Sequence, residues 1–203
     1  EKDLVRRKGI SIIYQQNNLL SDFTALENVT IPLVIQGYNW RDATKKANKI
    51  LNSVNLSSRI NHFSSELSGG EQQRVALIRA LASKPKAMLL DEPFSSLDVW
   101  TKFEVAEEVI SFLKASSTPT LMVTHDPVEA MTMADHIALM DAGTIIQTGP
   151  PTELYRHPGS PFCARFLGEV LEFSGVVDHG MVKTPLGPVP AGDEKDGEKM
   201  VVL

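Results

Sequence analysis

The sequence lacks several features that mark particular classes of protein. It has one cysteine, Cys163, among 203 residues, which excludes an internal disulfide framework and suits a reducing compartment. Lys and Arg total 20 against 25 Asp and Glu, so the basic excess typical of nucleic-acid-binding proteins is missing. No uninterrupted apolar run approaches the roughly 20 residues that a membrane-spanning helix requires. We therefore expect no nucleic-acid partner and no membrane span in this chain.

Other absences concern the two ends of the chain and phosphate binding. The first residue is Glu1 rather than Met, and no basic-then-apolar leader follows, so we expect no signal peptide and a truncated N-terminus. The chain stops on the strand-like run Val201-Val202-Leu203, which predicts a truncated C-terminus as well. No Gly-Lys dipeptide occurs, which excludes a phosphate-binding loop of the form G-x-x-x-x-G-K-[ST] within these residues.

What is present is a succession of strand and helix patterns that predicts an α/β layer with a largely parallel core. We expect strands at residues 9–14, 87–90 and 118–123, and a hairpin over 136–147. Helices are expected at 41–54, at 72–82, after Asp98, and from 127 through 134. The helix after Asp98 is expected to point five apolar side chains inward: Phe103, Ala106, Val109, Ile110 and Leu113. Beyond Gly168, frequent Gly and Pro and short alternating runs predict the start of a small β domain.

The sharpest local motif is the string Leu-Ser-Gly-Gly-Glu-Gln-Gln-Arg at residues 67–74. Ser68 followed by Glu71 matches a capping box and predicts a helix start. Gly69 and Gly70 would let an anion approach the backbone amides there, where the helix dipole favours negative charge. The alternative interpretation is simply a flexible helix N-terminus.

Three further signals lie at the predicted carboxyl ends of strands, where open α/β sheets bind ligands. Asp91 and Glu92 end one apolar run, and two such acids can take different roles, one holding Mg²⁺ and one polarising a water. His125 follows the run 121–123, and Gln15 follows the first strand. Taken singly, these residues also allow a non-functional interpretation. The two acids could be a solvated strand end, and the histidine could have a structural role.

Together, in this order and spacing, these residues resemble the ATP-binding subunits of ABC transporters over about residues 5 to 168. The resemblance implies an α/β fold of the P-loop NTPase type, an N-terminally incomplete ABC nucleotide-binding domain at 1–168. It implies a helical subdomain at about 36–82 and the beginning of a truncated regulatory β-barrel at 169–203. It also implies that Gln15 is the Q-loop glutamine, 67–74 the signature motif, Asp91 and Glu92 the end of Walker B, 95–98 the D-loop, and His125 the switch histidine.

The resemblance further implies a mechanism with ATP and Mg²⁺. Two subunits would close head to tail, so that Ser68, Gly69 and Gly70 contact the γ-phosphate bound by the partner subunit. The roles implied for the remaining residues are these: Asp91 and Gln15 at the Mg²⁺, Glu92 as general base, His125 at the γ-phosphate, and Asp98 bridging the dimer. The missing phosphate-binding loop is expected upstream of Glu1, so this fragment alone is expected to be inactive.

The segments 124–130, 149–155 and 166–169 resemble bacterial importers, and the implied function is ATP-driven solute uptake across the inner membrane. The implied partners are a second ATP-binding subunit, transmembrane permease subunits and a substrate-binding protein, with the chain peripheral on the cytoplasmic face. Residues 16–35 are where the family docks on its permease. Apolar residues there, namely Leu19, Leu20, Phe23, Leu26 and Ile31, could serve that contact or the core.

Alternatives stay open at this stage. Residues 19–33 resemble lipoprotein-export or methionine-import subunits, which favours an export ATPase as one alternative. A non-hydrolysing fragment or regulatory relative is another, because the phosphate-binding loop is missing. A DNA-repair or chromosome-maintenance ABC ATPase would need a long coiled coil or zinc module, and neither heptads nor paired cysteines occur. The transported substrate is not encoded in such a subunit.

Overall fold

The computed structural model describes residues 9–15, 17–171, 173–185, 187–191 and 199–202, without the side chains of 174 and 199–202. The chain divides into two compact units, Glu1–His125 and Asp126–Leu203. The domain boundary predicted near residue 168 therefore stays a prediction, since the compact units divide at a different place. We describe each unit separately.

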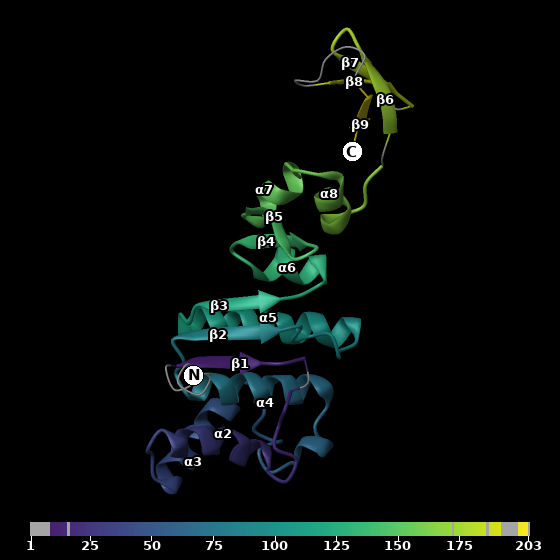
Figure 1. The fold of residues 1–203 in the computed structure, drawn as a ribbon. Helices are drawn as coiled ribbons and strands as arrows, with labels where there is room; N and C mark the ends of the chain where they lie inside the picture. The colour runs from purple at the N-terminus through teal and green to yellow at the C-terminus, as the bar shows by residue number, and fades with distance from the viewer. Residues whose placement is uncertain (1–8, 16, 172, 186, 192–198, 203) are drawn as a thin grey trace. The chain divides into compact units, whose positions relative to one another are not determined.

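The first unit is built on a parallel sheet of three strands in the order β1-β2-β3. Strand β1 is Ile10–Ile13, β2 is Ala87–Asp91 and β3 is Thr120–Val123, which confirms the three predicted strands. The register pairs Ile13 with Leu90 and Asp91 with Val123. Figure 1 shows the three arrowheads pointing the same way, so the carboxyl ends of all three strands share one edge.

In the described part of the first unit, the sheet is accompanied by four α-helices and one short 3₁₀ helix. They are α2 (Ala25–Ile35), α3 (Trp40–Asn52), the 3₁₀ helix Ser64–Glu66, α4 (Gly69–Ala82) and α5 (Val99–Ser116). In Figure 1, α4 lies beside β1, and α2 and α3 lie beyond α4. A single apolar core joins α2, α3 and α4 through fully buried residues such as Val29, Leu51 and Val75.

Helix α2 was not foreseen, because residues 23–34 show little helical period in their apolar pattern. Its start has a clear signal, since Thr24 caps the helix and forms a capping box with Glu27. Pro32 lies inside the helix and removes one backbone donor. The helix is nevertheless formed because its buried residues pack into the shared core, which outweighs its weak local pattern.

The predicted inward face of α5 was wrong for Phe103, whose side chain is 51% exposed. The buried residues of this helix are Val105 and Val109. Phe103 precedes Val105 by two residues, which is about 200° of helical rotation, so it lies on nearly the opposite face. Val105 is buried because its side chain packs against Gly70 at the start of α4.

Three short helices and two antiparallel sheets make up the residues of the second unit that the structure describes. The helices are α6 (Pro127–Met133), α7 (Pro151–Arg156) and α8 (Pro161–Leu167). The predicted hairpin is confirmed as β4 (Ile137–Asp141) and β5 (Thr144–Gly149). The other sheet has the order β8-β7-β6-β9, from β6 (Phe173–Asp178), β7 (Met181–Thr184), β8 (Gly187–Pro190) and β9 (Lys199–Val202). These strands agree with a small β region, while a closed barrel stays a prediction.

Candidate functional site

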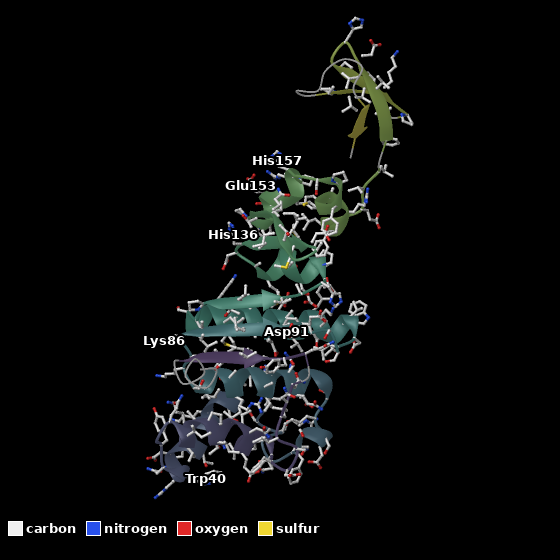
Figure 2. The ribbon with its side chains drawn as sticks, in the orientation of Figure 1. Trp40, Lys86, Asp91, His136, Glu153 and His157 are labelled. Carbon is white, nitrogen blue, oxygen red and sulfur yellow. The ribbon has the colours of Figure 1, made fainter. Side chains whose placement is uncertain are left out.

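Four predicted site residues lie at the carboxyl edge of the β1-β2-β3 sheet, and we call them the strand-end site: Gln15, Asp91, Glu92 and His125. Gln15 comes two residues after β1, Asp91 ends β2, and His125 comes two residues after β3. Figure 2 labels Asp91 at the arrowhead end of its strand. Because the strands are parallel and adjacent, the sheet brings these residues from distant parts of the sequence to one edge.

Within the strand-end site, Glu92 and His125 are in direct contact. The Glu92 carboxylate oxygen Oε1 lies 3.1 Å from His125 Nδ1, with the Glu92 side chain 31% exposed and the His125 side chain 74% exposed. The carboxylate is therefore oriented by the imidazole while remaining accessible to solvent. A half-exposed carboxylate oriented in this way can accept a proton from a water molecule.

The backbone at Glu92 is unusual and is stabilised by its neighbours. Its φ angle is 45°, in the left-handed region that non-glycine residues seldom occupy. The Glu92 amide donates to the Val123 carbonyl at 2.9 Å, and the Ser95 hydroxyl donates to the Glu92 carbonyl at 3.0 Å. Two residues later, Phe94 is completely buried and anchors the turn. Strained backbone that is overdetermined in this way is common at functional sites.

The second group of predicted site residues forms the start of α4, and we call it the signature turn: Ser68, Gly69, Gly70 and Glu71. The capping box is confirmed, because the Ser68 hydroxyl accepts from the Glu71 amide at 3.3 Å. In return, the Ser68 amide donates to Glu71 Oε2 at 2.8 Å. Ser68 and Gly69 are exposed, so the hydroxyl and the backbone at the start of α4 can be reached from solvent.

Glu71 is braced by a residue that the sequence did not single out. Arg59 Nε lies 2.8 Å from Glu71 Oε1, with side-chain exposures of 43% and 16%. Burial raises the pKa of Glu71, but hydrogen bonds from Arg59 and Ser68 outweigh this, and the net pKa lies below its ordinary value. The charge of Glu71 is thus balanced by Arg59, which matters at a helix start expected to receive an anion.

The two glycines of the signature turn are needed for packing inside the unit. A Cβ added to Gly69 would lie 3.0 Å from Leu97 Cδ2. A Cβ added to Gly70 would lie 2.9 Å from Thr101 Cγ2 and 3.0 Å from Val105 Cγ2. The signature turn therefore packs directly against the segment that follows Glu92 and against the start of α5.

Asp98, predicted to bridge two subunits, has a clear local role in this structure. Its carboxylate accepts from the Thr101 amide at 3.1 Å and caps α5. Hydrogen bonds from the Thr101 side chain and backbone lower the pKa of Asp98. Because Leu97 packs on Gly69, the segment 93–98 connects the strand-end site to the signature turn. A role of Asp98 across a dimer stays a prediction.

The chain that follows Gln15 is held by a buried polar residue that the sequence analysis missed. Asn28 is 1% exposed, and its amide nitrogen lies 3.0–3.2 Å from the carbonyls of Leu20, Phe23 and Thr24. Its side-chain oxygen accepts from the Leu20 amide at 2.9 Å. These bonds satisfy the amide, as burial requires. Glu27 and Thr30 are also polar, so the sequence around Asn28 gave no distinct signal for it.

Residues 16–35, predicted as a docking segment, divide between core and surface, with Gln16 outside the described residues. Leu19 and Leu26 pack against the helical core, and Ile31 is half-buried. Leu20 is 41% exposed, Phe23 is 37% exposed and Ile35 is 80% exposed, so apolar side chains of this segment are available for a partner.

Metal binding would depend on few protein ligands. Among the residues that the structure describes, no three His, Cys, Asp or Glu side chains lie close enough together to hold a metal ion. Asp91 is an exposed carboxylate at the strand end and could provide one ligand. That number fits Mg²⁺ at a nucleotide, which usually takes one or two carboxylates together with phosphate oxygens and water.

None of the helices in the described parts of the chain is both long and apolar enough to cross a bilayer.

A family model and several curated proteins match this chain in sequence. A family model described as ABC transporter matches residues 2–95. An Fe(3+) ions import ATP-binding protein of Rhizobium meliloti is 39% identical over 174 residues, which cover 86% of this chain and 44% of that protein. A methionine import ATP-binding protein of Lactiplantibacillus plantarum is 37% identical over 189 residues, which cover 91% of this chain and 55% of that protein. A spermidine/putrescine import ATP-binding protein of Thermotoga maritima is 36% identical over 163 residues, which cover 80% of this chain and 44% of that protein. The chain thus spans about half the length of the curated relatives it matches.

A solved structure agrees with them. It is the dimeric post-hydrolysis state of the ATP-binding cassette MJ0796 bound to ADP and Pi, with a TM-score of 0.63 and 31% identity. The match covers 74% of this chain and 68% of that one. The shared sequence, the shared fold and the arrangement of the strand-end site and the signature turn lead to one conclusion: this chain belongs to the family of ABC transporter ATP-binding domains.

Proposed function

We propose that this chain is part of an ATP-binding subunit that couples ATP hydrolysis to solute uptake through an ABC transporter. The observation that carries the proposal is the Glu92–His125 contact of 3.1 Å at the carboxyl end of the sheet. It provides an accessible, oriented carboxylate beside Asp91, as hydrolysis of a phosphoanhydride bond by activated water requires. The import direction is supported by the relatives, which are named as iron, methionine and polyamine import proteins.

In the proposed mechanism each site residue has a defined task. Asp91 would hold Mg²⁺ together with Gln15, and the bound ion would neutralise developing negative charge on the phosphate oxygens. Glu92 accepts the proton of the water, and His125 orients Glu92 and contacts the γ-phosphate. The Ser68 hydroxyl and the amides of Gly69 and Gly70 contact a γ-phosphate bound by a second subunit.

The proposed partners follow from the same reasoning. A second copy supplies the facing site, as supported by the dimeric solved relative. The exposed Leu20 and Phe23 are the proposed contacts to the permease subunits. A peripheral position on the cytoplasmic face of the inner membrane is part of the same proposal. A substrate-binding protein completes the importer.

The decisive experiment measures ATP turnover in the complete protein that contains this chain. The Glu92→Gln variant keeps the side-chain shape but removes the base, so we expect turnover to fall by about 10² to 10⁴. ATP binding, measured with a fluorescent nucleotide, is expected to stay within twofold. Glu107→Gln is the matched control, because Glu107 is an exposed acid on α5 outside the site. Near-normal turnover by Glu92→Gln would refute the assignment of the base.

A further inference from the structure

Arg79, in the last turn of α4, makes a contact that no part of the proposed mechanism yet uses. Its Nη1 donates to the carbonyl of Asn18 at 2.7 Å, and its Nη2 donates to the carbonyl of Asn17 at 3.3 Å. Both acceptors are backbone groups. The side chain is half-buried, and this burial lowers the pKa of Arg79. An arginine placed among backbone carbonyls in this way binds a chain segment rather than a carboxylate.

The segment that Arg79 binds is the one that leaves the strand-end site. Asn17 and Asn18 follow Gln15 closely, and Asn18 has a φ angle of 45°. This is the left-handed region, which asparagine tolerates better than most residues. The two guanidinium hydrogen bonds therefore hold the backbone at this left-handed residue, close to Gln15 in the sequence.

The helix that carries Arg79 is also firmly attached to the strand before Gln15. The Ser11 hydroxyl of β1 donates to the Ala80 carbonyl at 3.3 Å and lies 3.2 Å from the Ser83 hydroxyl. Gln36, at the end of α2, donates to the Ser83 carbonyl at 2.5 Å. The end of α4 thus contacts the chain on both sides of Gln15, while its beginning is the signature turn.

From this geometry we infer that Arg79 is a positioning residue for the strand-end site: it clamps Asn17 and Asn18 to the end of the helix whose start is the signature turn. This inference rests on the proposed function. A displacement of the signature turn would then be transmitted to Gln15, because α4 begins at the signature turn and its last turn holds the residues that follow Gln15. Arg79 touches no reacting group itself and acts through the placement of Gln15.

The test is a double-mutant cycle on ATP turnover in the complete protein. Arg79→Met retains an apolar stem of similar length but removes both hydrogen bonds, and we expect turnover to fall about tenfold with nucleotide affinity within twofold. Arg79→Lys keeps one charged donor and should recover part of the loss. In a Gln15→Ala background, adding Arg79→Met should change turnover by less than twofold. An equal loss in both backgrounds would overturn the positioning role.

A second measurement separates this inference from the proposed function. Amide hydrogen exchange over residues 17–23 is expected to be faster in Arg79→Met than in the parent protein, whether or not ATP is hydrolysed. The control is Arg41→Met, which removes an exposed cation from α3 and should leave that exchange unchanged. Unchanged exchange in Arg79→Met would refute the clamp. Absence of ATP turnover in the parent protein would instead refute the proposed function and leave the exchange result to decide the clamp.

Discussion

The strand-end site and the signature turn lie in the same unit but are built in opposite ways. His125 is 74% exposed, and its Nδ1 contacts one carboxylate oxygen of Glu92. Gly70, by contrast, is buried against Thr101 and Val105, and Glu71 is bonded to both Ser68 and Arg59. The strand-end residues are thus arranged for access, and the signature turn is arranged for rigidity.

This difference predicts which substitutions should change ATP turnover without changing the free energy of unfolding. An exposed side chain contributes little to the free energy of unfolding, so changing it should affect chemistry alone. A closely packed glycine or a bonded capping residue contributes to both. The three predictions that follow test this contrast, in order of decreasing expected effect.

The largest effect is expected for His125→Ala. Removing the imidazole leaves Glu92 without its orienting contact, so ATP turnover of the complete protein should fall by about 100-fold. Because His125 is mostly exposed, the free energy of unfolding should change by less than about 0.5 kcal/mol. His136→Ala, at an exposed histidine of the second unit labelled in Figure 2, is the control for both measurements. A large loss of stability in His125→Ala would contradict the contrast.

An intermediate effect is expected for Gly70→Ala. The added methyl group would approach the stiff β-branched side chains of Thr101 and Val105 at 2.9–3.0 Å. We expect overpacking to lower the free energy of unfolding by about 1–2 kcal/mol in denaturant titrations. In Gly69→Ala the methyl group meets only the flexible end of Leu97, so its cost should be smaller. Equal stability of the two variants would show that the signature turn is not tightly packed.

The smallest effect concerns the pH dependence of Glu71. Its folded-state pKa lies below the ordinary value of 4.5, so the carboxylate stabilises the fold above that pH. This contribution should be lost as the pH falls through the folded pKa. Comparison with Glu71→Gln should show a difference in unfolding free energy below about 1 kcal/mol at pH 7, because Arg59 is partly exposed.

The direction of the change with pH is the critical observation for Glu71. The difference between the parent protein and Glu71→Gln should shrink in acid. Glu104→Gln, at an exposed acid of α5, is the control and should show no such trend. A difference that grows as the pH falls would contradict the bracing of the signature turn by Arg59.

Much of the strand-end site was predictable because local patterns mark the ends of strands. The apolar run before Asp91 and the run before His125 identify β2 and β3, and parallel strands bring their ends together. The Ser68–Glu71 capping box is equally local, since it depends on a spacing of three residues. The supporting residues Arg59, Asn28 and Arg79 were missed. Arg59 and Arg79 contact segments 12 and about 61 residues away in the sequence, which no local spacing predicts. The burial of Asn28 depends on the packing of α2 into the core.

The sequence by itself determined where most of the helices and strands begin and which side chains can carry the chemistry, because capping, strand periodicity and side-chain type are local properties. It left α2 undetermined and assigned Phe103 to the wrong face of α5. Only the tertiary structure decided those points, together with the 3.1 Å Glu92–His125 contact and the packing of Gly70 on Val105. The physical reason is that burial and contact depend on what else occupies the same space, and that is settled only when distant segments fold together.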